Sequence, residues 1–81
     1  MDQQLLAYVT TARLRSFSEA ARVLYLTQPA VSQHVRNLER ALGVRLLERN
    51  SRQVALTAAG VLVYEQGGEI LRQYDQMRQR V

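Results

Sequence analysis

The residues with the most informative chemistry lie on one side of a helix expected over residues 28–42. With 100° between successive positions, one side of this helix collects Pro29, Ser32, Gln33, Arg36 and Arg40. This side offers hydroxyl, amide and guanidinium groups but no carboxylate. Such groups hydrogen-bond to the base edges and phosphates of nucleic acids. The pattern therefore predicts a helix face that reads a DNA duplex.

The other side of the same helix, roughly 150° away, is apolar and predicts the core contact. It consists of Val31, Val35, Leu38 and Leu42. Thr27 is a typical N-cap, Pro29 suits the first turn because no N–H is needed there, and Gly43 is a typical C-cap. These signals predict that the helix ends near Leu42.

A shorter helix is expected just before it. Ser16 and Glu19 form an S-x-x-E capping box and Ser18 is a second N-cap candidate, so the helix is expected to start near Ser18. Phe17 is expected to pack into the core. Small residues on the inner face allow the close crossing that a helix-turn-helix needs; this face holds Ala20, Ala21 and Leu24.

The segment Tyr25-Leu26-Thr27 is the expected turn between the two helices, which makes a helix-turn-helix over about residues 18–37. Many such turns place glycine where the chain needs a positive φ; here Tyr25 occupies that position, which suggests some other turn geometry. Leu26 is expected to enter the core, and Thr27 to cap the second helix.

Two further elements are expected to support this pair. Residues 2–14 predict a bracing helix with one apolar stripe. Residues 46–56 predict a β-hairpin wing, in which Val54 and Leu56 point inward and Ala55 points outward. Arg49 and Arg52 flank the tip of this hairpin, where an arginine suits a phosphate or the minor groove.

The last helix is expected over residues 58–81, capped by Thr57. Its apolar positions repeat at alternating spacings of four and three residues, as in a heptad seam. A second copy of the chain is the expected partner of this seam, although packing against the helix at 2–14 is an alternative. The seam consists of Val63, Gly67, Ile70, Tyr74, Met77 and Val81.

Charge and composition narrow the function classes. The chain has 81 residues and a net charge of +4. All of that excess lies in residues 1–56, which hold eight arginines and four acidic residues, and residues 57–81 are neutral. Every basic residue is arginine, which can contact phosphate or guanine in bidentate fashion. This asymmetry favours a polyanionic partner.

Other classes fit the sequence less well. The chain has no cysteine and one histidine, His34, with no metal-ligand spacing or catalytic constellation around it, so no enzyme, metal site or cofactor is expected. No apolar run reaches the roughly 20 residues of a membrane span, and a cytoplasmic location is expected. A protein-binding winged helix remains an alternative, and a steep loss of DNA binding with salt would distinguish the two. A structural coiled-coil protein is a weaker alternative, because the heptad seam covers only the last third of the chain.

Three segments together resemble the DNA-binding domain of LysR-type transcriptional regulators. They are SFSEAARVL, LTQPAVSQHVRNLERALGVRLLER and LTAAG, in the family's order. The resemblance implies that the start of the recognition helix, at Gln28, Pro29 and Ser32, enters the major groove. The next position is often arginine in the family but is Gln33 here, and an amide favours adenine.

The resulting expectation is a mainly α protein: a winged helix-turn-helix over residues 1–57, with three helices and a small wing, followed by a linker helix at 58–81 that forms a homodimer on inverted-repeat double-stranded DNA. The family also implies a C-terminal effector-binding domain for a small molecule, absent from this chain. The expected DNA contacts are Ser16, Ser18, Thr27, Gln28, Pro29, Ser32, Gln33, Arg36, Arg49 and Arg52.

Overall fold

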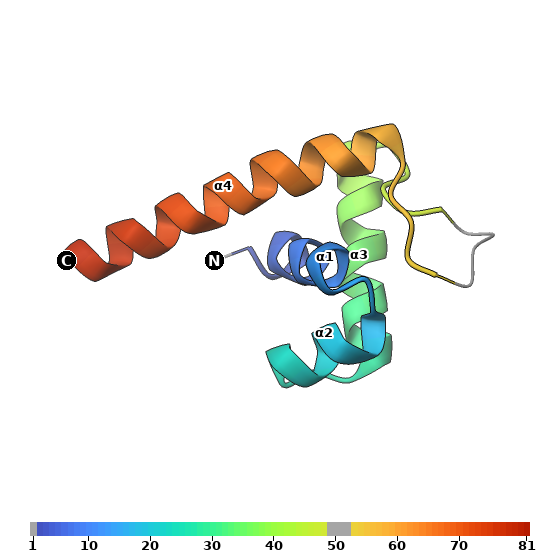
Figure 1. Cartoon of the computed structure of the whole chain (residues 1–81), viewed down its shortest axis with the longest axis horizontal. Helices are drawn as coiled ribbons and strands as arrows, with labels where there is room; N and C mark the ends of the chain where they lie inside the picture. The colour runs from blue at the N-terminus through green and yellow to red at the C-terminus, as the bar shows by residue number, and fades with distance from the viewer. Residues whose placement is uncertain (1, 49–52) are drawn as a thin grey trace.

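A computed structural model of the chain describes residues 2–48 and 53–81. The helices in these ranges are α1 (Gln3–Leu14), α2 (Phe17–Leu24), α3 (Gln28–Leu42) and α4 (Ala58–Arg80). Helix α1 lies at the centre and packs against the other three, and α4 extends well beyond the compact part (Figure 1). The mainly α architecture, with three helices followed by a long one, is confirmed.

The helix ends follow the capping residues. The Ser16 hydroxyl accepts the N–H of Glu19, so α2 begins at Phe17, one residue before the expected start. Thr27 caps α3 through the N–H of Ala30, and Gly43 ends α3 with a φ of 72°. Thr57 caps α4 through the N–H of Gly60. Each cap satisfies backbone groups that a helix end leaves without partners.

The core consists of two adjoining apolar clusters, and α1 contributes to both. The smaller cluster joins α1 to the helix-turn-helix through Ala7, Ala20, Ala21 and Val31. The half-buried Phe17 packs against both clusters, as expected. The larger cluster ties α1 and α3 to the segment after α3, and it consists of Tyr8, Val9, Ala12, Val35, Leu38, Leu46 and Leu47.

Two leucines that were expected in the core are exposed. Leu42 is 48% exposed because it ends α3 at the edge of an open groove, which Leu5 and Leu62 also line. Leu26 lies at the surface just after the positive φ of Tyr25, where its backbone N–H bonds to the carbonyl of Ala21. This hydrogen bond closes a Schellman-type helix end, which keeps Leu26 in the turn.

The expected wing differs from a regular hairpin in the described residues. Instead of two strands, the structure has an isolated antiparallel bridge between Leu47 and Leu56. Two backbone hydrogen bonds flank this bridge, from the Glu48 N–H to the Ala55 carbonyl at 2.9 Å and from the Thr57 N–H to the Leu46 carbonyl at 3.0 Å. Val54 and Leu56 pack against the larger cluster, as expected. The expected tip, with Arg49 and Arg52, lies outside the described residues.

Helix α4 is fixed to α1 at two glycines. The Tyr8 hydroxyl donates to the Gly60 carbonyl at 2.7 Å, and burial, aided by the nearby Glu39, raises the pKa of Tyr8 to about 12. Further along α4, Gly67 is buried against the side chains of Leu5 and Val9. The part of α4 near α1 is therefore held rigidly, and the rest of α4 projects away.

Candidate nucleic-acid interface

The outward face of α3 is exposed, as the sequence predicted. Gln28, Pro29, Gln33 and Arg36 are exposed and Ser32 is half-buried, whereas Val31, Val35 and Leu38 lie in the core. Among the residues of α3, the single carboxylate, Glu39, is buried. The exposed surface of this helix therefore presents amide, hydroxyl and guanidinium groups to a partner.

The exposed polar groups of α3 are connected to one another. Gln33 Nε2 donates to Asn37 Oδ1 at 2.9 Å, and Arg36 Nη2 donates to Gln33 Oε1 at 3.4 Å. Arg40 Nη2 also donates to Asn37 Oδ1. Asn37 was not among the residues predicted from the sequence, although it lies four positions after Gln33, where helix side chains meet.

The predicted DNA-contact hydroxyls of Ser16, Ser18 and Thr27 lie at the starts of α2 and α3. Ser16 and Thr27 each accept a backbone N–H as helix caps, which leaves the hydroxyl proton of each for donation. Ser18 on α2 donates to Gln28 Oε1 at 3.1 Å, so it lies directly beside the start of the recognition helix. The structure thus brings Ser18 and Gln28 together.

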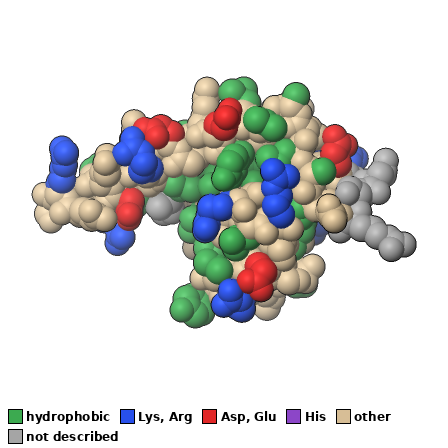
Figure 2. All heavy atoms as spheres, viewed as in Figure 1, with side chains coloured by type: hydrophobic (Ala, Val, Ile, Leu, Met, Phe, Trp, Pro, Cys, Tyr) green, Lys and Arg blue, Asp and Glu red, His purple; other side chains and the backbone are tan. Residues whose placement is uncertain are grey.

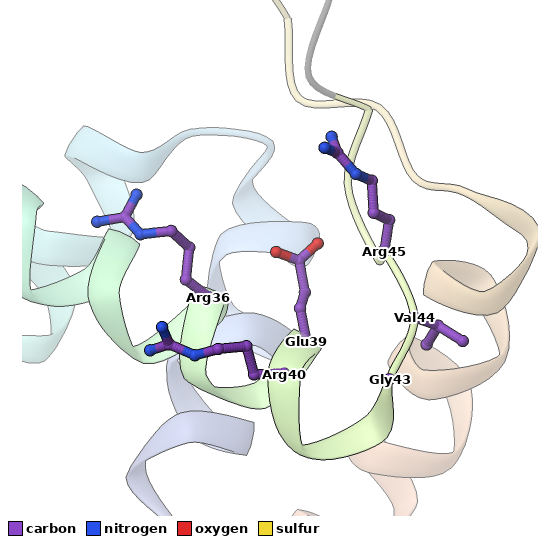
Figure 3. A pocket seen from close by; sticks show the side chains of 6 residues that line it. All are labelled: Arg36, Glu39, Arg40, Gly43, Val44 and Arg45. Carbon is purple, nitrogen blue, oxygen red and sulfur yellow. The ribbon is translucent and has the colours of Figure 1, made fainter.

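Three arginines surround an open cleft at the end of α3 (Figure 3). Arg36 and Arg40 extend from α3, and Arg45 comes from the segment that follows Gly43. The cluster is positive and lies next to the exposed face, where it extends the surface available to a polyanion. Sequence reasoning missed Arg45, which has no periodic pattern around it.

Glu39, which lines the same cleft, has a structural role that the sequence did not reveal. Its Oε2 accepts the backbone N–H of Leu46 at 2.8 Å and that of Leu47 at 3.3 Å. A carboxylate that accepts two buried N–H groups satisfies donors that would otherwise be costly to bury. Glu39 thereby ties the first half of the wing segment to α3.

The seam of α4 divides into two parts. Gly67 packs against α1 of the same chain and Val63 is half-buried, which is the alternative that the sequence left open. Beyond them, Ile70 and Met77 are each 56% exposed. Tyr74 is half-buried and Val81 is exposed.

Several charged side chains of α4 pair with each other within the helix. Arg72 pairs with Glu69, and Arg78 pairs with Asp75 at 3.1 Å, as predicted. Figure 2 shows acidic and basic side chains next to each other along the projecting helix. The Arg72 guanidinium holds the pKa of Glu69 below its usual range. In residues 2–48 and 53–81, no helix combines the length and hydropathy of a membrane span.

The fold and this face define the class of domain. A short helix and a longer one meet at a tight turn, α1 braces them, and the outer side of the longer helix carries groups that bind nucleic acid. This is a helix-turn-helix domain.

Comparisons with known proteins agree with this class. The model of the bacterial regulatory helix-turn-helix proteins of the lysR family matches residues 3–61. The chain is 45% identical over 76 residues to a probable cat1 operon transcriptional activator of Acinetobacter lwoffii. This match covers 94% of the chain and 25% of the activator. The chain belongs to the lysR family of bacterial regulatory helix-turn-helix proteins.

Solved structures show the same arrangement of helices. The crystal structure of the BenM DBD with catB site 1 DNA has a TM-score of 0.93 at 36% identity, covering 99% of this chain and 89% of that one. Full-length BenM has a TM-score of 0.90 at 37% identity, covering 98% of this chain and 26% of that one. The chain thus spans about a quarter of the length of these full-length proteins.

Proposed function

We propose that this chain is the DNA-binding part of a homodimeric bacterial transcriptional regulator of LysR type, which binds double-stranded DNA sequence-specifically in the cytoplasm. The observation that carries the proposal is the outward face of α3, which exposes hydrogen-bonding groups without a carboxylate. The fold of the chain matches that of the BenM DBD in a crystal structure with DNA. The family consists of regulators rather than enzymes.

In this proposal α3 lies in the major groove and reads base edges with Gln28, Ser32 and Gln33. Phosphates are held around it by groups that carry no sequence information. These groups are Ser18, Thr27 and Arg36, while Arg49 and Arg52 steady the wing. Ser16 is a further DNA contact, and Pro29 enters the major groove with Gln28 and Ser32.

The dimer is proposed to form through the projecting part of α4. Two copies would then place their α3 helices about one DNA turn, or a small multiple of it, apart on an inverted repeat. Exposed apolar side chains at Ile70 and Met77 support this arrangement, because a lone projecting helix leaves them in water. In the whole protein, a C-terminal domain would bind the small-molecule effector.

Arg36 and Gln33 give a matched pair of variants that tests these roles. We expect Arg36→Ala to weaken binding to all duplexes about equally and to reduce the slope of log affinity against log salt by about 1, because one phosphate contact is lost. We expect Gln33→Ala to relax the base preference at one or two positions, at a cost of about 1–3 kcal/mol for the preferred site.

The measurement is selection of bound sequences from randomised duplex DNA, followed by salt titrations of wild type and both variants. If Arg36→Ala changed only which bases are preferred, its assignment to a phosphate would be wrong. If the wild type bound no duplex at low salt, the proposed function would fail.

A further inference from the structure

Gln33 is held at both ends of its amide by neighbours on the exposed face of α3. Its Nε2 donates to Asn37 Oδ1 at 2.9 Å, and its Oε1 accepts from Arg36 Nη2 at 3.4 Å. Asn37 Oδ1 also accepts from Arg40 Nη2. The four side chains thus form one line of hydrogen bonds with an arginine at each end.

Arg40 fixes the direction of this line through Asn37, and Arg36 adds only its longest contact, at 3.4 Å. A guanidinium group has donors and no acceptor. The atom of Asn37 that faces Arg40 must therefore be its oxygen, and the atom of Gln33 that faces Arg36 must also be its oxygen. Because Asn37 Oδ1 is an acceptor, Gln33 must turn its NH2 group toward it. A flipped Gln33 amide would place oxygen against oxygen and N–H against guanidinium.

The hydrogen-bonding capacity that remains on Gln33 is that required by adenine. A side-chain amide has two N–H donors and two acceptor lone pairs, and the neighbours use one of each. In the major groove adenine offers the N7 acceptor and the N6 donor, whereas guanine offers two acceptors, N7 and O6. An amide whose donor and acceptor are held in place can bond to both N7 and N6 of adenine. On guanine, the amide oxygen would find no donor.

We propose that Asn37 and Arg40 are positioning residues that hold the Gln33 amide in the orientation that reads adenine. The inference rests on the proposed function, since it requires α3 in the major groove. Exposed hydrogen bonds between helix neighbours are weak in water. They strengthen where the duplex excludes water and lowers the local dielectric. The effect therefore shows in base preference, not in the stability of the free chain.

The test compares two substitutions of similar size at Asn37. Selection from randomised duplexes with wild type and Gln33→Ala first identifies the base pair whose preference depends on Gln33. Binding of the chain is then measured on four duplexes that differ only at that pair. Wild type is expected to prefer adenine by about tenfold or more.

Asn37→Leu removes the acceptor, and it is expected to reduce this preference to about twofold without changing any other position. Asn37→Asp keeps an acceptor for both neighbours, so it is expected to retain the adenine preference. Its overall affinity is expected to fall, because it adds a negative charge beside the phosphates.

The outcomes separate this inference from the function on which it rests. Retained adenine preference in Asn37→Leu, a changed preference at a different base pair, or a Gln33-dependent preference for another base would overturn the inference and leave sequence-specific binding intact. A wild-type chain without any base preference would overturn both. If Asn37→Asp keeps the adenine preference that Asn37→Leu loses, the loss comes from the missing acceptor and not from a disturbed helix.

Discussion

Gly60→Ala is expected to lower the free energy of unfolding by about 3 kcal/mol and the Tm by roughly 15 °C. A Cβ at this position would overlap the backbone carbonyl oxygen of Leu46 and lie 2.9 Å from the Tyr8 hydroxyl. Backbone atoms cannot move aside as a flexible side chain can, so α4 would have to shift. The shift would also break the hydrogen bond from Tyr8 to the Gly60 carbonyl.

Gly68→Ala is the matched control, because it makes the same change in the same helix. A Cβ at Gly68 meets no atom within 4 Å among the described residues. This variant is expected to gain about 0.5–1 kcal/mol from helix propensity. Thermal unfolding followed by far-UV circular dichroism, at one protein concentration, measures both variants. Equal stability of the two would show that Gly60 is not the close contact between α4 and the core.

Ile70→Asp and Met77→Asp are each expected to give a monomer whose affinity for a duplex with two half-sites falls by on the order of 100-fold. Each places a charge in the exposed part of the seam, where pairing with a second copy would bury it without a partner. Affinity for a duplex with one half-site is expected to stay the same, because α3 is untouched.

Sedimentation velocity and binding to one-site and two-site duplexes measure these effects. Gln76→Asp adds the same charge at an exposed polar position of α4 and is expected to remain a dimer. Figure 2 shows hydrophobic side chains gathered below α4. Ile70 also lines an open groove together with Leu42 and Leu62. If both aspartate variants stayed dimeric, the interface would have to lie elsewhere.

The parts of the fold that were predicted from the sequence depend on local rules. Helix caps, the two faces of α3 and the ion pairs of α4 involve residues within four positions of each other, so their spacing in the sequence is sufficient. The exposed face of α3 was likewise predicted from the helical spacing of its polar residues. Tyr25 is an exception: the sequence suggested some other turn geometry there, but Tyr25 takes the positive φ usual for glycine, at 57°.

The features that sequence reasoning missed depend on contacts between distant segments. Tyr8 meets Gly60 across 52 positions, and neither residue belongs to a periodic pattern that would link them. Glu39 is buried because the following segment folds back over it. Leu42 was expected in the core because periodicity gives a side chain its direction, but periodicity does not show that the end of α3 borders an open groove.

Amide chemical-shift mapping by NMR, with the chain titrated by a selected duplex at low salt, tests whether the outward face of α3 contacts DNA. We expect the largest shifts at Gln28, Ser32, Gln33 and Arg36, smaller ones at Ser16 and Ser18, and little change at the buried residues of α1. Shifts concentrated on other surfaces while α3 stays unchanged would contradict it.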